Sequence, residues 1–160
     1  MRYQFRIATD RGMNLVFMCE NDPGMCDDWD ANGGGNKVIR MHPEDLIPMQ
    51  IPANGDTLRP VEHGAALENV EAEDYDEARE QWCKQNGKAG REILGQMYGE
   101  PSWIQGDETP NCDECGQPMR HVAQIEQGPD WKTEMNFGGG GCAYLFDCAC
   151  EGSAKFLWQC

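Results

Sequence analysis

The chain opens with short stretches in which apolar and polar residues alternate, a pattern that predicts β-strands. Residues 4–7 and 15–19 have this pattern, and residues 10–12 between them are typical of a tight turn. A third predicted strand covers residues 38–41, after a loop over residues 21–36 that is rich in acidic residues and glycine. This part of the chain therefore predicts three strands joined by turns.

The middle of the chain changes from strand to helix periodicity. Residues 42–64 are rich in proline and glycine and predict a connector with one extended piece near residues 49–51. A helix fits residues 73–85, because apolar side chains from Tyr75 to Trp82 recur at helical spacing and acidic residues occupy the first turn.

The last third of the chain returns to strands. Residues 121–125, 142–148 and 154–158 have the composition of strands, and residues 151–153 are typical of a hairpin turn. The order of strands, helix and strands predicts an α+β fold, built mainly of antiparallel β-sheet with a central helix.

One order of features occurs twice in the chain. A strand, a turn with proline, an Asp-Trp pair, a glycine run and a second strand follow one another in residues 16–41 and again in residues 122–146. Asp28 begins the first Asp-Trp pair and Asp130 begins the second. This order predicts two related β-units that superpose on each other.

The length of 160 residues suits one domain. We predict a single domain over residues 1–160, with subunits over residues 1–64 and 100–160 joined by a helical segment over residues 65–99. Hydrophobic residues make up 39% of the chain, which predicts a thin core that a bound metal would help to stabilise.

Two cysteine pairs with short spacing predict a metal site. Cys112 and Cys115 form a Cys-x-x-Cys pair, and Cys148 and Cys150 form a Cys-x-Cys pair close to the predicted hairpin turn. Four thiolates at these spacings are typical of a tetrahedral structural zinc site, which leaves no open coordination position. Two alternatives stay open: His121 replaces one cysteine as a ligand, or the cysteines are reduced and packed.

The loop from Asp28 to Gly33 matches the first half of a calcium-binding loop, with oxygen-bearing side chains at alternate positions and glycine at the sixth. The bidentate glutamate expected at position twelve is missing, because Ile39 stands there. We therefore do not expect calcium, and we expect these acidic side chains to bond their own backbone in tight turns. Cys19 and Cys26 precede this loop and are expected to pack, with a second metal site as the alternative.

The net charge of −15 comes from 28 acidic residues against 13 lysines and arginines. Such a surface repels nucleic acid and anionic membranes and attracts basic proteins, so we expect a basic protein partner. The alternative is that the acidic residues only keep the protein in solution. We expect the partner surface to include Asp22, Asp27, Asp28, Asp30, Glu73, Asp74, Asp76 and Glu77.

No secretion signal and no apolar run of membrane-spanning length is visible, and the nine cysteines are an odd number. These features predict a cytoplasmic protein with reduced thiols. Enzymatic motifs are scarce: the chain has only two serines and three histidines, and none stands in a known catalytic motif. A Cys–His pair that meets only in space stays open.

Several short motifs occur together along the chain. They are Cys-Glu-Asn-Asp-Pro-Gly-Met-Cys at residues 19–26, Pro-Ser-Trp-Ile-Gln at 101–105, Cys-x-x-Cys-Gly at 112–116, Asn-Phe-Gly at 136–138 and Phe-Leu-Trp-Gln at 156–159. With these motifs the chain resembles the YwqG-like family of bacterial cytoplasmic proteins. The resemblance implies an α+β fold with duplicated β-units and no agreed catalytic residues. It also implies a link to toxin–immunity loci, where such domains are proposed as immunity proteins.

Charge and resemblance together predict a non-enzymatic acidic binding protein, an immunity protein that neutralises a basic toxin domain in the bacterial cytoplasm. One alternative is a small zinc-dependent enzyme or thiol redox protein that uses the cysteine cluster. A second alternative is a zinc-stabilised adaptor for other host proteins, which differs from the first function only in its partner.

Overall fold

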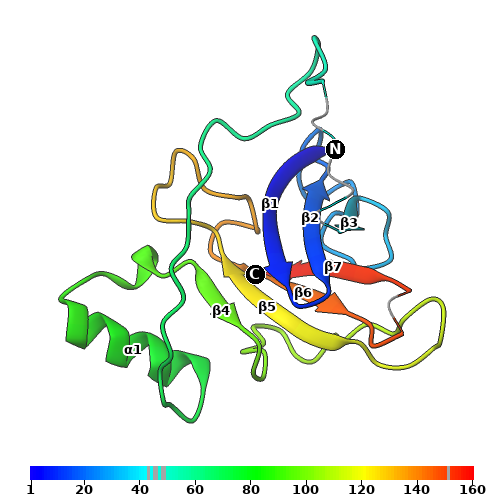
Figure 1. Ribbon diagram of the computed structural model, residues 1–160. Helices are drawn as coiled ribbons and strands as arrows, with labels where there is room; N and C mark the ends of the chain where they lie inside the picture. Colours follow the sequence, from blue (N-terminus) through cyan, green and yellow to red (C-terminus); the bar gives the residue numbers. More distant parts are fainter. Residues whose placement is uncertain (43, 45–46, 48–49, 151) are drawn as a thin grey trace.

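The first sheet is formed by the N-terminal part of the chain. The computed structural model describes residues 1–160 except 43, 45–46, 48–49 and 151. Strands β1 (Arg2–Thr9), β2 (Gly12–Met18) and β3 (Asn36–Met41) pair antiparallel in the order β1-β2-β3 (Figure 1). The three predicted strands are confirmed, and each begins two or three residues before its predicted start.

The second sheet is formed by the C-terminal part. Strands β4 (Gly95–Met97), β5 (Arg120–Glu126), β6 (Cys142–Asp147) and β7 (Ala154–Gln159) pair antiparallel in sequence order. Three of these strands match the prediction, whereas the short β4 has no alternating pattern and was missed. The predicted α+β fold of mainly antiparallel sheet is confirmed.

The single α-helix among the described residues, α1 (Tyr75–Asn86), is followed by a 3₁₀ turn, η2 (Gly90–Glu92). The Asp74 carboxylate caps its N-terminus, and Gly87, with φ of 63°, ends it in the left-handed conformation. Helix α1 is central in the sequence only, because in space it lies at one side of the molecule (Figure 1). Its Tyr75 hydroxyl donates a hydrogen bond to Glu126 at the end of β5.

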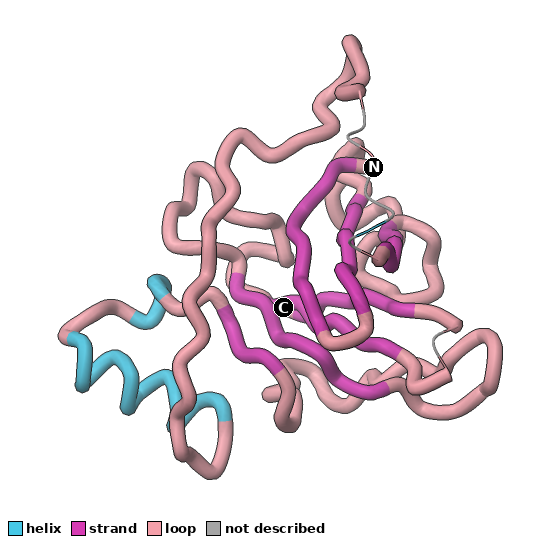
Figure 2. Tube along the Cα trace, in the orientation of Figure 1, coloured by secondary structure: helices cyan, strands magenta, loops and turns pink. Residues whose placement is uncertain are grey.

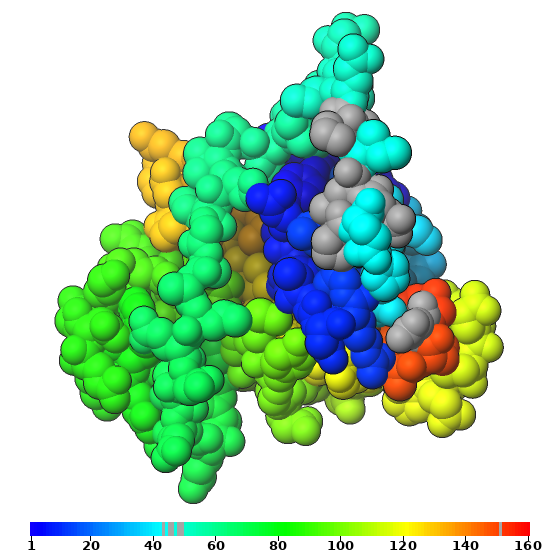
Figure 3. Space-filling model, in the orientation of Figure 1, coloured from blue at the N-terminus to red at the C-terminus, as the bar shows by residue number. Residues whose placement is uncertain are grey.

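Residues 50–74, which lead to α1, form an extended loop (Figure 2). It runs as a continuous band between α1 and β1 on the face shown in Figure 3. Arg59 fastens it by donating to the Gln4 side chain on β1 and to the carbonyl oxygen of Thr133. The extended piece predicted near residues 49–51 lies partly outside the described residues.

Two hydrophobic clusters cover the two faces of the second sheet. The first cluster lies between the sheets and joins Val16 and Val38 of the first sheet to Leu145 and Phe156 of the second. The second cluster lies on the other face, where Tyr144 and Phe146 of β6 pack against Trp103. Strand β6 is therefore buried along its whole length, because both of its faces are covered.

The two predicted β-units share one feature in the structure: β2 pairs with β3, and β5 pairs with β6, each across a long loop and in antiparallel direction. Their Asp-Trp pairs differ, since Asp28 is buried whereas Asp130 is exposed. Superposition of the units stays a prediction.

Candidate metal centre

Two tight turns bring the four predicted cysteines together. The first turn carries Cys112 and Cys115: the N–H of Gly116 donates to the Cys112 carbonyl at 2.9 Å, and Gly116 has a φ of 70°. Glycine suits this position because a side chain would strain the left-handed backbone. The second turn joins β6 to β7 and carries Cys148 and Cys150.

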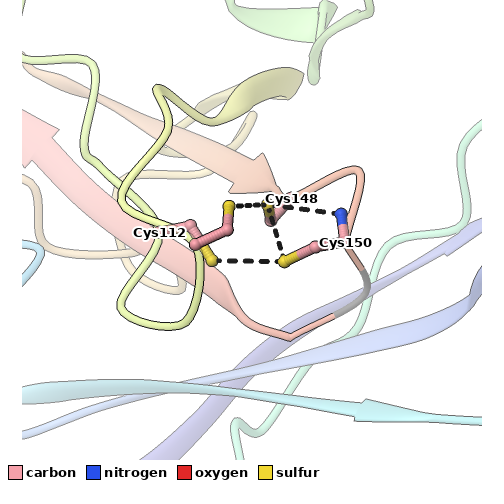
Figure 4. A group of neighbouring side chains, drawn as sticks. Cys112, Cys148 and Cys150 are labelled. Carbon is pink, nitrogen blue, oxygen red and sulfur yellow. Dashed lines mark hydrogen bonds between the residues drawn. The ribbon is translucent and has the colours of Figure 1, made fainter.

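The four sulfur atoms lie within 4.8 Å of one another. The Cys112–Cys150, Cys115–Cys148 and Cys148–Cys150 sulfur distances are 3.5, 3.4 and 3.1 Å (Figure 4). Zinc–sulfur bonds of about 2.3 Å in a tetrahedron separate the sulfurs by about 3.8 Å, so small shifts would fit an ion. The structure thus places these four cysteines as a group that can hold a metal ion.

The thiols of the cluster differ in their acidity. A hydrogen bond from the Ser153 hydroxyl, helped by the backbone N–H groups of Cys115 and Glu114, lowers the pKa of the Cys112 thiol to about 6. A hydrogen bond with the neighbouring Cys148 stabilises the protonated form of Cys150 and raises its pKa. Four thiolates this close repel one another, so a bound cation would let all four ionise.

Charged side chains fix the two turns from outside the cluster. Lys155 on β7 is buried and donates to Asp113 in the first turn and to Asn32 in the β2–β3 loop, each at 2.6 Å. Arg11 at the tip of the β1–β2 hairpin donates to the Cys148 carbonyl at 3.1 Å. The contacts of Lys155 with Asn32 and of Arg11 with Cys148 therefore connect the candidate metal centre to a loop and a hairpin of the first sheet.

The segment that leads to the first turn has almost no regular secondary structure, and two buried glutamines hold it. The Gln124 side-chain oxygen accepts from the N–H of Ser102 at 2.8 Å. The Gln159 side-chain oxygen accepts from the N–H groups of Ile104 and Gln105 at 3.1 and 2.9 Å. Sequence reasoning missed both glutamines as structural residues, because a glutamine in a strand gives no local sign of burial.

A second group that the sequence did not reveal is an ion pair at the end of β6. Asp147 is fully buried and accepts two hydrogen bonds from the Arg120 guanidinium at 3.1 and 3.0 Å. Arg40 of β3 lies 3.7 Å from the same carboxylate. This pairing compensates for the burial of a charge directly before Cys148.

His121 lies outside the four-cysteine group. Its Nδ1 atom contacts the Gly99 carbonyl at 3.0 Å, and its ring meets the edge of Phe146. Burial lowers the pKa of this histidine, so its neutral form is favoured. It serves as a core residue here, and the alternative of His121 as a replacement ligand is not supported.

The predicted acidic surface divides into two separate groups. Helix α1 and the loop between β2 and β3 lie on opposite sides of the molecule (Figure 1). The prediction for Asp28 is wrong, because this residue is 2% exposed and its carboxylate accepts from Gly24 and from the Trp158 indole. Asp30 is half-buried, and the other six predicted partner residues are exposed: Asp22, Asp27, Glu73, Asp74, Asp76 and Glu77.

Several of these acids already have structural contacts. Asp74 accepts from the N–H of Glu77, and Glu77 accepts from the N–H of Glu73, an arrangement similar to a capping box but shifted by one residue. In the β2–β3 loop, Asp30 accepts from the N–H of Asn32 at 2.7 Å. The carboxylates of Asp28 and Asp30 therefore stabilise turns.

Comparison with known protein families, curated proteins and solved structures finds no match for this chain. The resemblance to the YwqG-like family therefore stays a prediction. Within the described residues, no helix has the length and apolar character needed to cross a membrane.

Proposed function

We propose that this protein is a zinc-stabilised, non-enzymatic binding protein with a basic protein partner. The observation that carries the zinc part is the group of four thiols, all within 4.8 Å of one another. Soft thiolate ligands in a tetrahedral set favour zinc among the common metals of proteins. Cys112 and Cys148 are buried and Cys115 and Cys150 are exposed, so the ion would sit at the surface.

The geometry favours a structural over a catalytic role for this metal. Four protein ligands fill a tetrahedral zinc ion and leave no position for substrate or water. The four cysteines come from two turns, the one after the irregular segment and the one between β6 and β7. A metal bound between these turns would therefore stabilise the second hydrophobic cluster, to which Cys112 and Cys148 belong. The alternative of a thiol redox protein is supported by the low pKa of Cys112, and it requires the metal-free protein to be the working form.

The partner part of the proposal rests on charge. Residues 62–80 carry eight acidic residues against one arginine, and the first half of α1, from Tyr75, lies in this stretch. Glu71, Glu73 and Asp76 are exposed there. Such a face would steer a basic protein toward it at low ionic strength. The most specific form of the proposal is a cytoplasmic immunity protein that neutralises a basic toxin domain, which is the role that the family resemblance implies; an adaptor would differ only in its partner.

The metal part is tested by elemental analysis of untagged protein, with thiol titration before and after chelation. We expect one zinc per chain and four additional reactive thiols after chelation, matching the four-cysteine group. Cys112→Ser should lose the metal, whereas the matched variant Cys160→Ser, at an exposed cysteine outside the group, should keep it. Metal-free protein with four equally reactive thiols would contradict the proposal.

The partner part is tested by titration with basic bacterial toxin domains, with poly-lysine as the nonspecific reference. We expect one domain to bind in a defined ratio, more weakly as salt rises from about 0.05 to 0.5 M. The variant Glu71→Gln, Glu73→Gln, Asp76→Asn should weaken binding about fivefold or more. The variant Asp22→Asn, Asp27→Asn changes the other predicted acidic group, in the loop on the opposite side, so weakening by only one of the two variants identifies the group that binds, and equal weakening by both would indicate nonspecific attraction.

A further inference from the structure

A second pair of cysteines lies in contact in the first sheet, apart from the metal centre. Cys19 directly follows β2, and Cys26 lies in the loop after it. The Cys19 thiol donates a hydrogen bond to the Cys26 sulfur over 3.3 Å. Both residues are half-buried, so small reagents can reach them.

The backbone holds the two thiols in place before any bond joins them. The N–H of Cys19 donates to the Gly35 carbonyl at 2.7 Å. Gly35 also lies against the Cys26 carbonyl, so closely that a Cβ atom on Gly35 would stand 2.0 Å from that oxygen. Both cysteines are therefore positioned by the same residue, and closing a bond between them would cost little further chain entropy.

A metal is a weaker explanation of this pair. Within the described residues, the four-cysteine group is the one set of three or more cysteine, histidine or acidic side chains close enough to hold an ion. Cys19 and Cys26 alone would supply two ligands, and structural zinc takes four. The contact of two thiols is the geometry that precedes a disulfide bond.

We propose that Cys19 and Cys26 form a reversible disulfide bond by exchange with a small disulfide of the glutathione class. One thiolate attacks the small disulfide, which breaks its S–S bond and releases one small thiol. The second thiolate attacks the resulting mixed disulfide and releases the second small thiol. The protein loses two protons and two electrons, and the small disulfide gains them.

The disulfide would close a ring over residues 19–26, which includes the exposed Asp22 and ends beside the exposed Asp27. It would fix these acidic side chains at the end of β2 while leaving α1 unchanged. The metal would protect its own four thiols, because a metal-bound thiolate attacks disulfides poorly. A disulfide within the chain would therefore form at the end of β2, apart from the metal centre.

Tryptic peptide mapping tests the proposal on the metal-loaded protein. No lysine or arginine lies between Arg11 and Lys37, so one peptide over residues 12–37 contains Cys19 and Cys26 and no other cysteine. The protein is equilibrated in glutathione buffers of graded redox ratio, alkylated, digested and analysed by mass spectrometry. The measurement is made at equilibrium, because the nearby Cys19 thiol raises the pKa of Cys26 and therefore slows its reaction at neutral pH.

We expect this peptide to lose two hydrogens and to take up no alkyl group once oxidised, and to take up two after reduction. The Cys19–Cys26 pair should be half-oxidised at a fraction of glutathione disulfide about tenfold or more below the fraction that half-modifies the exposed Cys160 as a mixed disulfide. The reason is that the second thiol of the pair is already in place. Cys19→Ser and Cys26→Ser should each leave only a mixed disulfide on the remaining cysteine.

The wild-type measurement decides the question even if a variant fails to fold. The proposal would be overturned if the peptide still took up two alkyl groups at a ratio that modifies Cys160. It would also be overturned if Cys19 or Cys26 were linked to a cysteine outside the peptide. Zinc content is measured on the same samples, so failure of this pair is distinguishable from failure of the metal centre.

Discussion

The two sheets differ in how their strands are covered. Strand β3 of the first sheet alternates buried and exposed residues, which is typical of a strand with one face in water. Strand β6 of the second sheet is buried at every position. The second face of β6 is covered by an irregular segment around Trp103 and by the turn that carries Cys112.

Covering a sheet with an irregular segment costs more free energy than covering it with a helix, because the segment lacks the repeating backbone hydrogen bonds of a helix. Here the side chains of Gln124 and Gln159 satisfy part of its backbone, and a metal ion bound by the four thiols would hold its end. With the proposed zinc bound, the second sheet would depend on the metal, whereas the first sheet depends on strand pairing and packing. The following predictions test this difference.

Metal removal should have the largest effect. Structural zinc contributes on the order of 10 kcal/mol in zinc-finger peptides, so chelation should lower the melting temperature by more than about 10 °C. Circular dichroism with and without chelator measures the shift. Hydrogen exchange should increase first around residues 99–119 and in β7, with β1 and β2 protected longer. Uniform exchange over both sheets would contradict the inferred difference.

Trp103→Ala should have the next largest effect. The Trp103 ring lies 4.5 Å from the Tyr144 ring and 5.9 Å from the Phe146 ring, so its loss opens the second cluster. We expect a loss of about 3 kcal/mol in the free energy of unfolding, measured with urea. The matched variant Trp131→Ala removes a ring that is 74% exposed and should change stability by about 0.5 kcal/mol or less.

Asp28→Ala and Asp130→Ala compare the two Asp-Trp pairs directly. The first substitution leaves the N–H of Gly24 and the indole N–H of Trp158 without their acceptor, which should cost about 2 kcal/mol. The second removes an exposed acceptor for the N–H of Lys132 and should cost about 0.5 kcal/mol. Equal losses in urea unfolding would indicate that the two turns are equivalent after all.

The pH dependence of the metal-free, reduced protein should show the smallest effect. Because the Cys112 pKa is lowered from 9.0 to about 6, the folded state binds fewer protons than the unfolded state between these values. Stability should therefore rise with pH over this range, and the contribution should be absent below pH 6. Above pH 9 the raised pKa values of Cys148 and Cys150 act in the opposite direction.

Ser153→Ala provides the control for this pH dependence. The Ser153 hydroxyl is the largest cause of the low Cys112 pKa, so its removal should flatten the rise. Unfolding in urea at several pH values, with chelator and reductant present, measures both proteins. An unchanged slope in the Ser153→Ala protein would show that another group titrates in this range.

Local patterns were sufficient to predict most of the elements. Alternation predicted β1, β2 and β3, and helical spacing with an acidic first turn predicted α1. The spacing of Cys112, Cys115, Cys148 and Cys150 predicted the group that the structure brings together, because two short turns need little else to present four thiols.

The short strand β4 could not be predicted, because three residues carry no pattern and the strand exists only by pairing with β5. The same limit applies to Asp28. Its local sequence predicts an exposed acidic residue, whereas in the fold its carboxylate accepts a hydrogen bond from the indole of Trp158, far along the chain. Both cases depend on a partner that is distant in the sequence.

The sequence by itself determined every described strand except β4, the helix, the acidic charge and the four candidate ligands, since each depends on neighbouring residues. The tertiary structure alone decided which acids are buried, that the two acidic groups lie apart, and that Gln124 and Gln159 support an irregular segment. It also decided the contact of Cys19 with Cys26. These features depend on which distant surfaces meet when the apolar faces of the two sheets are removed from water.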